Sequence, residues 1–185
     1  MQALVRRGYH AVETGIVDDV ADYIHADFVN DEAINEPPAA ASGGPQGFAT
    51  TVTWLHVAYS GLDITEHAFF HDGDQYVSEV TMHGTHTGPL VVRDGDRYLV
   101  LPPSQRRFAH RQVHIGRVVD GKLVEHRAIR DDLGLMHQLG YAPPTLRALA
   151  RQLWWAVSGR RRAAIEAFEK LEPAIRRLAD VPISG

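Results

Sequence analysis

Apolar residues recur every three or four positions along the first part of the chain, which is the spacing of a helix that buries one side. Three stretches show this pattern, at residues 4–12, 16–24 and 46–59, and Gly15 separates the first two. Residues 25–45, which lie between the second and the third, are rich in Pro, Gly and Asn, as turns are. The pattern predicts three helices before any strand.

The spacing changes to two from Leu62 onward, which is the period of a strand with one buried side. A short helix follows this region, capped by Asp131 or Asp132 and ended by Gly140. We therefore expect an α+β fold in which the helices pack on one side of a curved antiparallel sheet. The expected strands lie near residues 62–71, 75–87, 97–101, 108–119 and 122–130.

An Asp-Gly pair at residues 120–121 lies between two apolar runs and predicts a tight hairpin. A two-residue loop would pair His114 with Arg127, whereas a three-residue loop closed by a glycine bulge pairs His114 with His126. We favour the longer loop because it gathers the polar side chains on one concave face. That face would hold His110, Gln112, His114, His126, Ala128 and Arg130.

The opposite face of the same hairpin mixes apolar and charged side chains, which suits a contact between subunits. We therefore expect a homodimer or a higher homo-oligomer. The residues expected on this face are Val113, Ile115, Leu123 and Ile129, among Arg111, Arg117, Glu125 and Arg127.

The composition narrows the function classes. The chain has no cysteine, which excludes disulfides and thiolate metal sites. Its net charge of −4 argues against general binding of nucleic acid, which needs a basic surface. Because there is neither a signal-peptide pattern nor an apolar run long enough to cross a bilayer, we expect a cytoplasmic protein.

The charge is divided unevenly between two segments. Residues 1–144 hold 11 basic and 19 acidic side chains, whereas residues 145–185 hold 8 and 4. We expect residues 1–144 to form the functional domain and residues 145–185 to form a basic, amphipathic helical extension. We expect the extension to dock on the acidic domain rather than on a membrane. Its apolar stripe consists of Leu146, Leu149, Leu153 and Val157, with Trp154 and Trp155 beside it.

Several short motifs, in this order along the chain, carry a family resemblance. They are DDVADYIHADFVN at 18–30, GPQGF at 44–48, GTHTG at 84–88, PPSQRRF at 102–108, QVHIGRV at 112–118 and EHRAIRD at 125–131. With this order of helices and strands, residues 1–141 resemble the SnoaL-like polyketide cyclases, a branch of the NTF2-like cone fold.

The resemblance implies a deep apolar pocket between the helices and the sheet, where a flat aromatic substrate undergoes an intramolecular aldol condensation without a metal or an organic cofactor. His114 matches the active-site histidine of the family, and His86 and Asn30 match positions that line its pocket. The catalytic aspartate of the family corresponds to Ala128 here. An alanine can neither accept nor donate a proton.

The residues themselves suggest a proton-transfer site on the concave face. His114 lies within cross-strand reach of His126, and two imidazoles in an apolar cavity lower each other's pKa, which suits a neutral base. Asp131 would be the replacement acid, although capping the following helix explains an aspartate there equally well. We therefore expect His114, His126 and Asp131 to be catalytic.

The remaining candidates would contact the substrate. His86 shares the alternation of an apolar strand face and points into the core or the cavity. We do not expect a metal site, because His83 and His86 are three apart on a strand and face opposite ways. The expected substrate-binding residues are His86, Asn30, Gln112, Trp54, Met82, Ala128 and Arg130.

These features favour an enzyme of specialised, polyketide-type metabolism that performs cofactor-free acid/base chemistry on an apolar polycyclic small molecule, by cyclisation, isomerisation or hydration. An alternative is a non-catalytic pocket protein that binds or carries an apolar ligand, which Ala128 makes credible. A third is a pure interaction module. The insert at residues 91–101 would form either a hairpin over the pocket mouth or a solvated protrusion.

Overall fold

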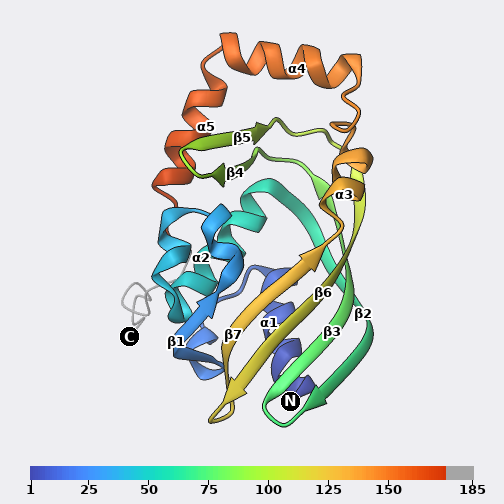
Figure 1. Ribbon diagram of the computed structural model, residues 1–185. Coiled ribbons are helices and arrows are strands. Elements are labelled where there is room, and N and C mark those ends of the chain that lie inside the picture. Colours follow the sequence, from blue (N-terminus) through green and yellow to red (C-terminus); the bar gives the residue numbers. More distant parts are fainter. Residues whose placement is uncertain (174–185) are drawn as a thin grey trace, which may run out of the picture.

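A curved five-stranded sheet and the helices in its concavity form the body of the protein in the computed structural model, which describes residues 1–173 (Figure 1). The strand order is β1-β7-β6-β3-β2, and β1 runs parallel to β7 while the other neighbours are antiparallel. The α+β class is confirmed. The strands of this sheet are β1 Ile24–Asn30, β2 Tyr59–Asp72, β3 Gln75–His86, β6 Arg107–Val119 and β7 Lys122–Arg130.

Two helices occupy the concave side of the sheet (Figure 1). Helix α1 spans Gln2–Thr14 and ends at Gly15, whose left-handed backbone (φ 74°) stops the helix. Helix α2 spans Gly44–Ala58, as the pattern predicts. Three short 3₁₀ turns lie between these helices, at Val20–Asp22, Asp31–Asn35 and Pro38–Ser42.

The helix expected at residues 16–24 is wrong. This segment holds only the 3₁₀ turn at Val20–Asp22 and then enters strand β1, which pairs with β7 and makes the sheet mixed rather than antiparallel. Two of the side chains that suggested the helix, Val20 and Ile24, are both buried. Residues four apart share a face in a helix and in a strand, so their spacing does not separate the two structures.

The hairpin between β6 and β7 closes with a two-residue turn. Asp120 and Gly121 both have positive φ angles (50° and 74°), as a type I′ turn requires, so the three-residue loop is wrong. A bulge beyond the turn then inserts one residue into β7 and shifts the pairing. As a result His114 lies opposite Ala128, and neither pairing considered from the sequence is formed.

The concave face nevertheless holds the six side chains expected on it. The actual register differs from the favoured one by two residues, and a shift of two leaves every side chain on its original side. Leu123 is the exception: it lies on the turn side of the bulge, is buried and packs in the interior rather than on the outer face.

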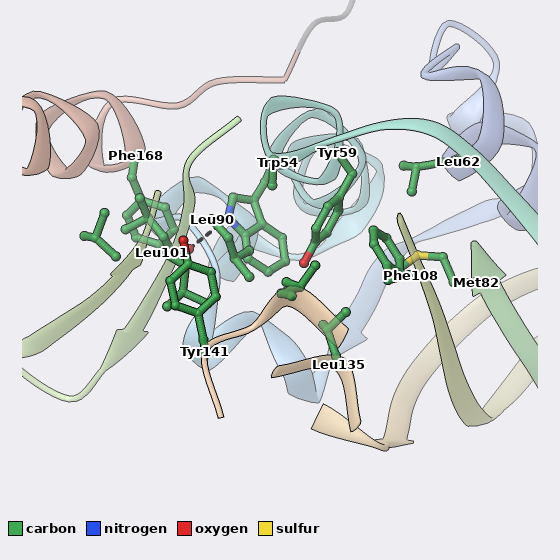
Figure 2. Packing of buried hydrophobic residues seen from close by; sticks show 14 of the residues in the cluster. Trp54, Tyr59, Leu62, Met82, Leu90, Leu101, Phe108, Leu135, Tyr141 and Phe168 are labelled. Carbon is green, nitrogen blue, oxygen red and sulfur yellow. Dashed lines mark hydrogen bonds between the residues drawn. The ribbon is translucent and has the colours of Figure 1, made fainter. Parts of the chain in front are cut away.

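The insert forms a small second sheet that covers one end of the body (Figure 1). Its strands are β4 Leu90–Asp94 and β5 Arg97–Leu101, and the exposed residues of the hairpin are 94–97 around the turn and Leu99. Figure 2 shows Leu90 and Leu101 packed beside Trp54, whose indole Nε1 donates a hydrogen bond to the Val91 carbonyl at 3.0 Å. The hairpin is therefore part of the core and not a solvated protrusion.

Three helices complete the described chain, and the last two belong to the basic extension. Their bounds are α3 Asp132–Leu139, α4 Leu146–Val157 and α5 Arg160–Glu169. Helix α5 docks through Phe168, which is buried in the core cluster (Figure 2). Its ring makes an edge-on contact with Tyr98 of β5. The rest of the expected extension, residues 174–185, lies outside the described residues.

Helix α4 docks differently from the expectation. Its buried residue is Ala148, whereas Leu146, Leu153 and Val157 of the apolar stripe are 85%, 66% and 74% exposed. The stripe thus faces away from the part of the body that the structure describes, and α4 contacts the core cluster through Ala148 and Trp155. No helix within residues 1–173 is long and apolar enough to cross a membrane.

Candidate active site

A cavity of about 340 Å³ lies between α1, α2, the concave face of the sheet and the β4–β5 hairpin. This volume is within the range that binds small organic ligands. Most of the wall is apolar and aromatic, and it draws on both hydrophobic clusters of the core. The polar residues of the wall are Asn30, Glu32, Asn35, Glu36, Thr51, His110, Gln112, His114, His126, Arg130 and Asp132.

A continuous chain of hydrogen bonds crosses one side of the cavity. His114 Nδ1 is 2.7 Å from His126 Nε2, and His126 Nδ1 is 2.9 Å from Asn30 Oδ1. In the other direction, His114 Nε2 is 2.9 Å from the side-chain amide of Gln112, and that amide is 3.1 Å from His110 Nδ1. Because alternate residues of a strand share a face, β6 supplies three consecutive members of this chain.

The two central histidines are neutral near pH 7. Burial lowers the pKa of His126 to about 4, with the Arg130 charge adding to the effect. Burial also holds the pKa of His114 well below its ordinary value, and the neighbouring His126, Arg130 and His110 act in the same direction. Each ring therefore has one N–H donor and one acceptor nitrogen.

The lowered pKa of His126 makes stability depend on pH. In the unfolded chain this histidine takes up a proton below about pH 6.5, whereas in the folded protein it does so only near pH 4. The free energy of unfolding is highest above pH 6.5 and decreases as the pH falls from 6.5 to 4, by up to about 1.4 kcal/mol per pH unit. We expect His126→Gln to flatten this slope in chemical unfolding measured from about pH 7.5 to about pH 4.5.

A matched control is His71→Gln, since His71 is exposed at the end of β2. This variant should retain the pH slope of the parent protein. An equal slope in the parent and in His126→Gln would show that His126 is not held neutral by the fold.

A carboxyl group that the sequence reading missed lies beside Asn30. Glu36 is only 3% exposed, and it accepts hydrogen bonds from the Thr51 hydroxyl and, at 3.4 Å, from Asn30 Nδ2. Burial raises the pKa of Glu36 above its usual range. Because it lies in the turn-rich segment after β1, its surroundings had no periodic pattern that would have indicated burial.

A second missed group is Asp132, the first residue of α3. Its carboxylate lies 3.4 Å from His110 Nε2 and 3.6 Å from Arg130 Nε. Contact with His110 and the nearby Arg130 charge hold the pKa of Asp132 below its usual range. Arg130 also forms an ion pair of 2.6 Å with Glu32, so the cation at the cavity wall is matched by two carboxylates.

The expected site residues separate into two groups. Eight of them line the cavity: Asn30, Trp54, Met82, Gln112, His114, His126, Ala128 and Arg130. Asp131 does not line it, because its side chain caps α3 by accepting a hydrogen bond of 2.9 Å from the Gly134 N–H. His86 does not line it either, since its ring is fully buried between Tyr59 and Tyr141 and accepts from the Ser104 N–H.

His110 is more deeply placed than its position near the start of the strand suggested. It is 3% exposed and lines the cavity wall. Within residues 1–173 no three His, Asp or Glu side chains are placed to hold a metal ion together. The wall therefore offers acid/base groups and hydrogen-bonding groups in an apolar enclosure.

Comparisons with known proteins agree with this architecture. The family profile of SnoaL-like polyketide cyclases matches residues 3–139. An aklanonic acid methyl ester cyclase of Streptomyces peucetius is 38% identical over 77% of this chain and 92% of its own length. A nogalonic acid methyl ester cyclase of Streptomyces nogalater is 34% identical over 70% of this chain and 90% of its own.

Solved structures with the same fold are more distant in sequence. TsrD from Streptomyces laurentii has a TM-score of 0.62 at 24% identity, covering 75% of this chain and 93% of its own. IdmH from Streptomyces antibioticus, described as a putative polyketide cyclase, has a TM-score of 0.56 at 21% identity, covering 75% and 97%. The resemblance inferred from the motifs is confirmed, and the chain belongs to the SnoaL-like polyketide cyclase family.

Proposed function

We propose that this protein is an enzyme of polyketide-type antibiotic biosynthesis that rearranges an apolar polycyclic substrate by proton transfer. The observation that carries the proposal is the chain of neutral histidines set into the wall of an otherwise apolar cavity. Its relatives named as cyclases of polyketide methyl esters support the substrate class. The reactions open to such a site are cyclisation, isomerisation and hydration.

The apolar wall and the histidines have separate tasks in this proposal. The aromatic and aliphatic side chains hold a flat substrate and exclude water, which strengthens electrostatic interactions inside the cavity. His114, at the centre of the hydrogen-bonded chain, acts as the base because a neutral imidazole has a free electron pair for a substrate proton. Substrate would displace one of its present partners, as is common when an empty site becomes occupied.

Ala128 favours a second candidate, a carrier that binds the same ligand without changing it. The methyl group of Ala128 lies across the strand pair from His114, where an acid would complete the aldol machinery that the resemblance implies. Binding and turnover must therefore be measured separately.

We expect the protein to bind aklanonic acid methyl ester and related polycyclic esters in calorimetry and to convert at least one of them. Cyclisation or isomerisation leaves the mass of the ligand unchanged, and hydration adds one water, so mass spectrometry with chromatography identifies the reaction. Binding without a product would favour the carrier, and the absence of binding would contradict both candidates.

A variant pair tests whether the ligand occupies the cavity. Gly8 of α1 lines it, and a Cβ atom added there meets only ordinary contacts with Phe48 and Leu123. Gly8→Leu should therefore fold and extend its side chain into the cavity. The control Ala3→Leu adds the same side chain on the exposed side of α1. Only Gly8→Leu should weaken binding.

A further inference from the structure

The hydrogen-bonded chain at the cavity has a fixed direction at one end. The backbone N–H of Glu32 donates to Asn30 Oδ1 at 3.2 Å, and the other end of that amide, Nδ2, donates to Glu36. A backbone N–H can only donate, so the orientation of the Asn30 side chain is settled. Asn30 Oδ1 is therefore an acceptor, and His126 Nδ1, which is 2.9 Å away, must carry a proton.

This direction propagates along the chain. A neutral His126 that donates from Nδ1 accepts at Nε2, so His114 must donate from its own Nδ1. His114 Nε2 is then a bare acceptor and needs a donor from Gln112. As placed in the structure, Gln112 turns its oxygen toward His114, which would leave two acceptors facing each other at His126 and Asn30.

Rotating the Gln112 amide by half a turn removes this conflict, because its oxygen and nitrogen exchange nearly equivalent positions. The amide nitrogen then donates to His114, and the amide oxygen accepts from His110 Nδ1. Every hydrogen bond of the chain is satisfied with neutral histidines. His110 is left with its second nitrogen, Nε2, unprotonated.

That nitrogen is in an unusual position. His110 Nε2 is buried and makes no hydrogen bond within residues 1–173, and the Asp132 carboxylate lies 3.4 Å from it. An electron pair facing a carboxylate oxygen is repulsive, whereas a proton between them would convert the contact into a charge-assisted pair. Among the side chains of this hydrogen-bonded chain, only His110 has a nitrogen that lacks a hydrogen-bond partner and lies beside a carboxylate.

We propose that His110 Nε2 carries an additional proton held against Asp132, and that His110 is the acid of the cavity. The charged and titratable groups around it are Asp132 from α3, Arg130 from β7 and His114 on β6, while Met82 of β3 lies opposite it in the sheet. Asp132 favours the imidazolium, and Arg130 is offset by Glu32 and Asp132 itself. Burial in the cavity wall thus places the proton of His110 where a bound substrate could receive it.

The catalytic part of this inference rests on the proposed function. His114 would remove a proton from a substrate carbon while His110 Nε2 gives its proton to the carbonyl oxygen where negative charge develops. The total number of protons on the protein is unchanged: one fewer on His110 and one more on His114, and exchange with solvent restores both. When the surroundings of two similar groups keep one protonated and the other unprotonated, a single site can supply both an acid and a base.

Nuclear magnetic resonance of protein labelled with ¹⁵N in histidine tests the protonation state without any substrate. We expect one buried histidine, identified by its loss in His110→Gln, to have both nitrogens protonated at pH 7. Asp132→Asn removes the neighbouring anion, so this variant should show the same histidine with only one protonated nitrogen at pH 7. Asp131→Asn is the matched control, because asparagine caps a helix as well as aspartate does, and it should leave both nitrogens protonated.

Neutral forms of His110, His114 and His126 throughout pH 6–8 would overturn the inference, as would equal effects of Asp131→Asn and Asp132→Asn. With a converted substrate in hand, His110→Gln should lower turnover about 100-fold. A protein that shows the imidazolium but converts no polyketide would contradict the proposed function and leave the protonation state established.

Discussion

Replacing His114 with alanine should lower turnover by about 10²-fold to 10⁴-fold while largely preserving the affinity for substrate. The reason is that His114 lies at the centre of the hydrogen-bonded chain, between His126 and Gln112, and is the proposed base. Most of the binding surface is apolar and comes from other elements, so it survives the substitution. Rates under saturating substrate and calorimetric affinities separate the two effects.

Two further variants make the His114 result interpretable. His114→Gln keeps a hydrogen-bonding side chain of similar size but cannot act as a base, so it should fold normally and remain inactive. His83→Ala removes a histidine from the other side of strand β3 and should leave turnover unchanged. Full activity of His114→Ala would exclude His114 as the base.

The sequence predicted which sheet face carries the site, but not how strands β6 and β7 pair. His110, His114 and His126 fell on the correct side because the side-chain period of a strand is two, and the combined error of turn and bulge was also two. The bulge itself has no local signal in the VVDGKLVE segment, since Val124 is as typical of a regular strand as its neighbours. Register therefore had to come from the three-dimensional structure.

The periodicity of apolar residues could not predict which acidic side chains lie in the site. Glu36 lies in a turn-rich segment and is buried beside Asn30 of β1 and Thr51 of α2, and residues 25–30 of that strand had been read as part of the same turn-rich segment. Asp131 and Asp132 are adjacent and chemically identical, so only the geometry of α3 shows that the first caps the helix while the second faces His110. Tertiary contacts, rather than residue type, assign their roles.

The exposed apolar stripe of α4 is a second case in which tertiary contacts could not be predicted from the sequence pattern. Its amphipathic pattern correctly predicts a helix, but a pattern does not identify which side docks. The side of α4 that contacts the core cluster carries Ala148 and Trp155 instead of the leucine stripe.

Introducing a carboxylate with Ala128→Asp should produce or raise aldol cyclisation of an anthracycline-type ester. Ala128 lies opposite His114 on the neighbouring strand and on the same face as His126, so an aspartate there would meet both imidazoles inside the cavity. The negative charge would raise the pKa of the adjacent histidine and supply the acid/base group that the family resemblance places at this position. General acid/base catalysis of this kind is worth about 10²-fold to 10⁴-fold in rate.

The matched variant is Ala128→Asn, which has nearly the same shape but cannot transfer a proton. Comparing the rates of ring closure in the two variants removes the effects of size and of lost cavity volume. A gain confined to Ala128→Asp would mean that the parent cavity already orients an aldol substrate and lacks only the acid. If neither variant closes the ring, the geometry of this cavity serves a different proton transfer, and isomerisation or hydration with His110 and His114 becomes the reaction to pursue.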